Sequence, residues 1–172
     1  MTFVMEKMLE HAVREISVFA KKHPNEHFYA FAISENLLCL NSEEAYAGSM
    51  ENYRPIAEKR YQKNIKALQT ADENSRIWRE ANIREYSTGE LFLAFRSNPD
   101  NWRYHGFAKL TSEYGYDENS YDDHYVQLFG VKDPSVLKTS YSTAMTELIR
   151  RLNVRGAFDC LKRTDDFYAN WW

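Results

Sequence analysis

A short, continuously apolar segment constrains the fold of this chain most. Residues 27–34 read HFYAFAIS, and Glu35 and Asn36 separate them from LLCLN at residues 37–41. An uninterrupted run of aromatic and aliphatic residues of this length is typical of a buried strand. Two such runs joined by a two-residue turn predict a β-hairpin. Other elements must therefore cover a small sheet.

Helical periodicity before and after this hairpin predicts the covering elements. Residues 3–21 place apolar side chains three and four positions apart, and Pro24 ends that helix. Residues 42–70 are predicted to be helical after an N-cap at Ser42. A break or a second helix start is expected near 49–54, where a glycine and a proline interrupt the pattern.

The second part of this central helical region has two distinct sides. Its apolar residues fall on one predicted face, namely Ile56, Ala57, Tyr61, Ile65 and Leu68. Its basic residues form a predicted exposed side, namely Lys59, Arg60, Lys63 and Lys66. The pattern is that of an amphipathic helix whose apolar face packs on the protein.

The middle of the chain carries weaker local signals. Residues 76–86 fit a helix or a pair of strands, whereas ELFLAFR at 90–96 favours a strand. Residues 97–101 read SNPDN and predict a turn. Residues 102–110 are read as a short strand or an irregular segment, and residues 125–131 as one more short strand or turn.

The last forty residues are again well patterned. Asp133 followed by Pro134 predicts the start of a helix that ends near Asn153, and residues 157–161 suggest a further helical turn. The final residues, DFYANWW, are too apolar for a frayed end and are expected to pack on the body. The predicted fold class is α+β: a small, mostly antiparallel sheet packed with N-terminal, central and C-terminal helices.

Length and charge narrow the possible functions. The 172 residues fit one domain, residues 1–172, and the net charge of −3 gives no global support for binding nucleic acid. The N-terminus lacks a signal-peptide pattern, and no apolar run is long enough to span a bilayer. Cys39 and Cys160 lack C-x-x-C spacing and are read as reduced core residues. We expect a cytoplasmic protein that binds neither nucleic acid nor membrane.

Familiar cofactor and catalytic motifs are absent from the sequence. It contains no G-x-G-x-x-G, no phosphate-binding P-loop and no G-x-S-x-G nucleophile turn. His23 and His27 have the spacing of two zinc ligands on a helix, but Pro24 interrupts that helix, so they are read as surface histidines. We therefore expect no cofactor, no resident metal and no enzyme activity.

One stretch concentrates negative charge and tyrosine. Residues 113–125 read EYGYDENSYDDHY, with five acids and no base, so the stretch carries −5 and the rest of the chain about +2. A calcium loop of the EF-hand type is disfavoured, because Asp122 stands where that loop needs Gly and Leu128 where it needs Glu. A weak cation site near Asp122, Asp123 and His124 stays open. Otherwise the stretch is a solvated loop or a surface for a basic protein partner.

If the stretch is a contact surface, its tyrosine and acidic side chains are the groups that meet the partner. The candidate partner-binding residues are Tyr114, Tyr116, Asp117, Glu118, Tyr121, Asp122, Asp123 and Tyr125. Trp102 and Tyr104 are further candidate apolar anchors, although a core position is favoured for Trp102.

Several segments together resemble a family of small bacterial proteins of unassigned function. They are HFYAFAIS at 27–34, the Trp-Arg-Tyr of 102–104, the helix from Pro134, and GAFDCLKRTDDF at 156–167, which fits a G-x-F-x-x-L-x-R-T-x-D-F ending. The resemblance implies one α+β domain and an immunity protein of a polymorphic-toxin system, which binds and neutralises a cognate toxin. It implies no catalytic residues. If the toxin is a nuclease, carboxylates of the immunity protein would occupy its basic groove.

Two other functions are open on the sequence. A small hydrolase would use carboxylates with His105 or His124, and it requires a concave pocket where those groups converge. A small-ligand-binding module would line a pocket with the abundant aromatic side chains.

Overall fold

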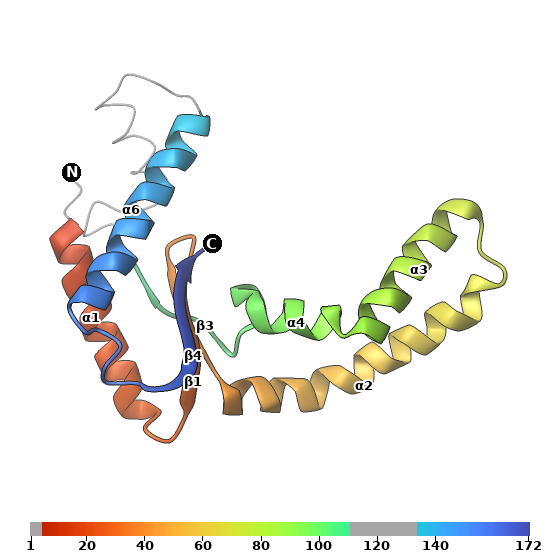
Figure 1. The fold of residues 1–172 in the computed structure, drawn as a ribbon, viewed down its shortest axis with the longest axis horizontal. Coiled ribbons are helices and arrows are strands. Elements are labelled where there is room, and N and C mark those ends of the chain that lie inside the picture. Colours follow the sequence, from red (N-terminus) through yellow and green to blue (C-terminus); the bar gives the residue numbers. More distant parts are fainter. Residues whose placement is uncertain (1–4, 111–133) are drawn as a thin grey trace.

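Two helices cover one face of a four-stranded sheet, and a pair of helices extends away from it (Figure 1). The computed structural model describes residues 5–110 and 134–172. The elements in chain order are α1 (Met5–Lys22), β1 (His27–Ser34), β2 (Leu37–Ser42), α2 (Glu43–Leu68), α3 (Glu73–Thr88), α4 (Glu90–Ser97), the 3-10 helix η1 (Pro99–Asn101), β3 (Tyr104–Lys109), α6 (Pro134–Val154) and β4 (Lys162–Trp171).

The sheet has the strand order β3-β2-β1-β4. The predicted hairpin is confirmed: β1 and β2 pair antiparallel, Ser34 opposite Leu37, and Glu35 in the turn has a φ of 54°. β3 pairs antiparallel with β2, whereas β4 runs parallel to β1. The α+β class is therefore confirmed, with a mixed sheet in which the C-terminal segment supplies an edge strand.

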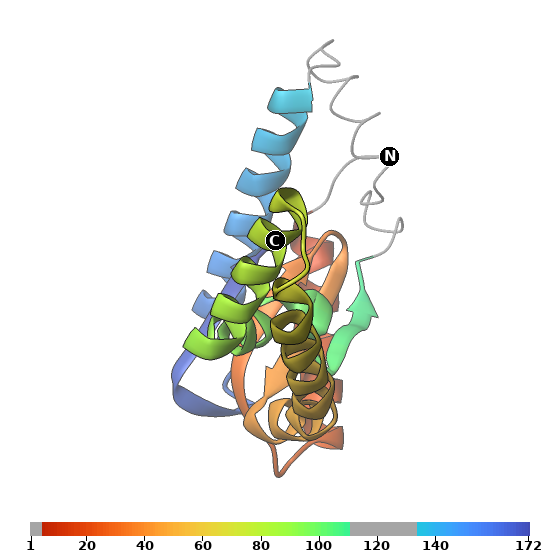
Figure 2. The same cartoon turned by 90° about the vertical axis from the view of Figure 1, so that its right-hand side faces the viewer.

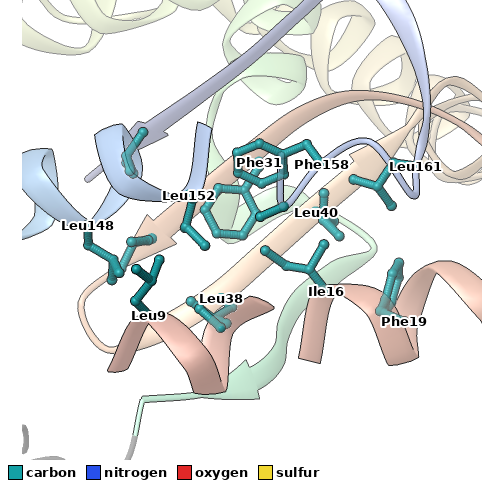
Figure 3. Packing of buried hydrophobic residues seen from close by; sticks show 14 of the residues in the cluster. Leu9, Ile16, Phe19, Phe31, Leu38, Leu40, Leu148, Leu152, Phe158 and Leu161 are labelled. Carbon is teal, nitrogen blue, oxygen red and sulfur yellow. The ribbon is translucent and has the colours of Figure 1, made fainter. Parts of the chain in front are cut away.

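The main core lies between this sheet and the α1–α6 pair (Figure 3). Phe31 of the central strand β1 is fully buried, and its ring centroid lies 5.0 Å from that of Phe158. Leu9 and Ile16 of α1 and Leu152 of α6 close over these rings. The predicted apolar faces of the first and last helices are thus the faces that bury the sheet.

A smaller cluster covers the opposite face of the sheet. Tyr29, Cys39 and Trp102 are buried there, and Trp102 is only 4% exposed. The predicted core positions of Cys39 and Trp102 are confirmed. Cys160 is exposed, so its predicted core position is wrong; the turn between α6 and β4 carries it to the surface.

Two predictions about the central region are also wrong. α2 runs unbroken through Pro55, because the proline lies on the exposed side, where water can bond the carbonyl that loses its donor. Residues 90–96 form the helix α4 rather than a strand. Phe92 and Phe95 pack on the ring of Tyr53 in α2, and a spacing of three residues brings both rings to one side only in a helix.

Candidate functional site

The acidic, tyrosine-rich stretch lies outside the described residues. This holds for all eight predicted partner-binding residues: Tyr114, Tyr116, Asp117, Glu118, Tyr121, Asp122, Asp123 and Tyr125. It holds equally for His124 and for the strand or turn expected at 125–131. Their role as a contact surface stays a prediction.

The other residues singled out from the sequence lie within the described region. Trp102 is buried and donates its indole N–H to the carbonyl of Arg96 at 2.8 Å, so it is no surface anchor. Tyr104 is half-buried and packs against the main core. His105 Nε2 lies 3.5 Å from Asp100 Oδ1, and the Asp100 side chain is largely exposed. The His105–Asp100 pair therefore lies on the surface of the described part of the chain.

The most distinctive feature is a helical arm, formed by α2 and α3, that extends from the sheet (Figure 1). Figure 2 looks along this arm and shows the two helices side by side. In α3 and α4, whose residues are all described, no side chain is buried. The buried residues of α2 are Ala45, Met50, Ala57 and Asn64. The arm thus has almost no apolar interior of its own.

Aromatic and polar contacts hold the two arm helices together. The rings of Tyr61 and Tyr86 stack with centroids 4.6 Å apart, and the Tyr86 hydroxyl donates to Glu58. Asn64 is 3% exposed, and its Oδ1 accepts a hydrogen bond of 3.1 Å from Arg79. Within the described residues, Asn64 Nδ2 and Arg79 Nε are buried without a hydrogen-bond partner. The arm therefore contains incompletely satisfied polar groups, which weaken it.

Asn64→Ala tests how the arm is held. Without the Asn64 amide, the guanidinium of Arg79 loses an acceptor in a buried place, which costs about 1–3 kcal/mol. We expect faster amide hydrogen exchange in α2 and α3 with unchanged protection in the sheet, because the substitution destabilises the arm alone and lets it open locally more often. Asn52→Ala is the control, since exposed Asn52 donates to the carbonyl of Gly48 in its own helix. Equal exchange in both variants would contradict this role of Asn64.

One side of the arm combines apolar and basic groups, which we call the arm patch: Ile56, Arg60, Lys63 and Trp78. The first three have spacings of four and three residues and share one side of α2. Trp78 of α3 is 51% exposed, and the Arg60 guanidinium lies 5.7 Å from its ring centroid, within cation–π range. Ile56 is 64% exposed. The predicted exposed basic side of α2 is confirmed, but Ile56, expected on the packed face, belongs to the exposed one.

The carboxylates in the middle of α2 lie on another side of the helix, together with Arg54. Glu51 and Glu58 are seven residues apart and so lie on one side of the helix, turned away from the side of Arg60 and Lys63. Glu58 is engaged there by Tyr86 and by the side-chain amide of Gln62. Carboxylates of α2 therefore do not cancel the positive charge of the arm patch, although Glu85 of α3 lines a small pocket together with Arg60.

A second cluster fixes the base of the arm to the sheet. Arg96 of α4 makes two hydrogen bonds to the Glu43 carboxylate at 2.8 and 2.5 Å, and its guanidinium lies 3.8 Å from the ring centroid of Tyr29. The Tyr29 hydroxyl donates to the Arg96 carbonyl. An open groove of about 340 Å³ lies beside this base and is lined in part by Tyr53, Phe95 and Trp172. The base of the arm is rigidly attached, whereas its far end is free of the body.

A polar cluster lies where α1, β1, β2 and β3 meet. The Glu26 carboxylate accepts hydrogen bonds from Ser42 and from Tyr104, the latter at 2.5 Å, and lies 2.9 Å from His23 Nδ1. Burial tends to raise the pKa of the Glu26 carboxyl, but the bonds from Ser42, Tyr104 and His23 together lower it below its usual range. Ser42 also caps α2 by accepting from the Ala45 N–H, as its predicted N-cap role requires. The cluster thus joins four elements through one ionised carboxylate.

Because the pKa of Glu26 is lowered in the folded protein, the direction in which acid changes the stability can be predicted. A carboxyl whose folded-state pKa is lowered stabilises the fold above its unfolded pKa, about 4.3, and this stabilisation is lost as pH falls through the folded value. Glu26→Gln should be less stable than wild type at pH 7 and should lose less stability on acidification to pH 3. Urea unfolding at both pH values measures this, with exposed Glu10→Gln as control. If wild type and Glu26→Gln lose the same free energy of unfolding between pH 7 and pH 3, the lowered pKa of Glu26 is contradicted.

Comparison of the chain with models of known protein families, with curated proteins and with solved structures found no match. The resemblance to immunity proteins therefore stays a prediction. Among the helices within residues 5–110 and 134–172, none is long and apolar enough to cross a lipid bilayer. The same residues contain no group of three or more His, Cys, Asp or Glu side chains placed to hold a metal ion.

Proposed function

We propose that this protein binds another protein, and that the arm patch is a principal contact surface. The observation that carries the proposal is the half-exposed Trp78 beside Arg60 on an arm that lacks an apolar interior. Trp and Arg are the residue types that contribute most to protein interfaces when a partner excludes water from them. Two helices projecting from a rigid base are also a common way to fill a groove on a partner.

The specific function we propose is that of a cytoplasmic immunity protein, which neutralises a cognate toxin by covering its active surface. The resemblance of residues 27–34, 102–104 and 156–167 to such proteins supports it. In this arrangement the arm reaches the toxin with apolar and basic groups, so the toxin surface under it is acidic and partly apolar. The acidic, tyrosine-rich stretch at 113–125 would contact a separate, basic region of the same toxin, such as the groove of a nuclease.

The test uses the product of the neighbouring gene, which the proposal expects to be a toxin. We expect the purified pair to form a stable complex, and co-expression of the protein to protect cells from the toxin. Calorimetric titration gives the affinity of the pair. An unrelated toxin of the same activity is the specificity control. If the neighbouring toxin neither binds nor is neutralised, the immunity function is wrong.

Charge reversal then separates the two surfaces. Arg60→Glu with Lys63→Glu changes only the arm patch, whereas changing Asp117, Glu118, Asp122 and Asp123 to Lys alters only the acidic stretch. We expect each set to weaken binding by more than about 1 kcal/mol, because each charge pairs with an opposite charge on the toxin. A set that leaves the affinity unchanged removes its surface from the interface.

A further inference from the structure

A small pocket lies away from the arm, between the end of α1 and the start of β4. Its volume is about 280 Å³, and it is lined in part by Ser17, Lys21, His23, Cys160 and Lys162. We call it the α1–β4 pocket. A volume of this size fits a small metabolite or an inorganic ion, not a large cofactor.

The polar groups around the pocket are mainly cationic or hydrogen-bond donors. Lys21 and Lys162 approach it from different elements, and Ser17 adds a hydroxyl. Among the described residues that line it, none is a carboxylate. Asp159 is next to Cys160 in the chain but is engaged by Arg163, whose guanidinium lies 3.0 Å away. The local charge of the pocket is therefore positive in a chain whose net charge is negative.

His23 is held in a fixed orientation at the edge of this pocket. Its ring stacks on Phe19 with centroids 4.2 Å apart, and its Nδ1 faces the Glu26 carboxylate at 2.9 Å. Because the two ring nitrogens lie on different sides of an imidazole, this leaves Nε2 turned away from Glu26. The carboxylate accepts from Nδ1 and fixes the orientation of the ring, so in the neutral ring Nε2 carries a lone pair and does not donate to an anion. His23 therefore marks the edge of the pocket rather than holding a ligand there.

Cys160 does not turn the pocket into a thiolate site. Although the residue is exposed, partial desolvation of the sulfur raises the pKa of its thiol, so the group is neutral near pH 7 and adds no negative charge. The thiol also donates to the Ala157 carbonyl at 3.4 Å. This arrangement favours binding of a ligand over nucleophilic chemistry at the sulfur.

We propose that the α1–β4 pocket binds a small anion through Lys21 and Lys162, beside His23, with a phosphate or carboxylate group as the recognised chemistry. Lysine ammonium groups bind such oxygens as point charges, and charge-assisted hydrogen bonds are stronger than neutral ones. The C-terminal end of α1, which carries a partial negative charge, faces the same region and weakens the binding of an anion. We therefore expect a dissociation constant of about 1 mM for a simple anion.

The test titrates the intact protein with inorganic phosphate, pyrophosphate and citrate at constant ionic strength. The readout is the NMR signal of the His23 ring, together with calorimetry. We expect saturable shifts of His23, and a loss of affinity of about tenfold or more in Lys21→Glu and in Lys162→Glu, since each reverses one charge beside the ligand. Saturation by the phosphates alone identifies a phosphate ligand, and saturation by citrate alone a carboxylate ligand.

Lys22→Glu is the matched control. Lys22 follows Lys21 in α1 and is exposed, but it is not among the described residues that line the pocket. The proposal is overturned if none of the three anions saturates the His23 signal by about 20 mM. It is equally overturned if Lys22→Glu weakens binding as much as Lys162→Glu, because the anion then senses only general charge. Either result leaves the proposed protein binding by the arm untouched.

Discussion

Replacing Trp78 with Ala is expected to weaken binding of the proposed toxin partner by about 2–4 kcal/mol, the range of an interface hot spot. This corresponds to a roughly 30- to 1000-fold rise in Kd. The physical reason is that Trp78 is half exposed in the free protein and presents the aromatic ring of the arm patch, next to the Arg60 guanidinium. A partner that covers the ring also excludes water from the cation–π pair, which strengthens it.

The control for Trp78 is the residue before it. Ile77 is 64% exposed and neighbours Trp78 in α3, but successive residues of a helix point about 100° apart. Ile77→Ala should therefore change the Kd by much less than Trp78→Ala. Far-ultraviolet circular dichroism should be the same for both variants, because α3 has no buried side chain to lose. Equal, small effects of both changes would remove Trp78 from the interface.

Phe31→Ala should lower the free energy of unfolding by about 3–5 kcal/mol, the usual cost of removing a large buried aromatic side chain. Phe31 lies in the central strand β1, is fully buried, and contacts the ring of Phe158. The lost ring leaves a cavity between the sheet and the helices α1 and α6 that these rigid elements cannot fill. Equilibrium unfolding in urea measures the change.

An exposed apolar residue provides the comparison for Phe31. Leu93 of α4 is 66% exposed, so Leu93→Ala should change stability by no more than about 0.5 kcal/mol. If the two changes cost the same, the core of this protein is not the sheet-and-helix interface seen here.

The parts of the fold that sequence reasoning predicted correctly are determined by neighbouring residues. The hairpin follows from two apolar runs and a two-residue turn, and the cap at Ser42 from a hydroxyl three residues before the N–H that it bonds. Long-range contacts decide the rest. Residues 90–96 are helical because Phe92 and Phe95 meet Tyr53, some forty residues away. The pairing of β4 with β1 likewise joins the two ends of the chain.

The candidate site was only partly visible in the sequence. The basic side of α2 could be predicted, because Arg60 and Lys63 recur at helical spacing and are exposed. Trp78 could not, since a tryptophan in an ambiguous segment is more often a core residue, and its exposure depends on how far the arm extends from the sheet. Polar Asn64 is buried and apolar Ile56 is exposed, the opposite of what their polarity predicts. The stacked rings of Tyr61 and Tyr86 determine which side of α2 faces α3.

Hydrogen exchange of the protein, alone and in complex with the proposed partner toxin, is the most direct test of the arm patch. Binding should slow exchange of the backbone amides in α2 and α3 around the arm patch, which a partner would cover. Protection in the free protein should be low there, because the arm has almost no buried interior. A stable complex in which arm exchange is unchanged, with new protection confined to other elements, would contradict the arm patch as the binding surface.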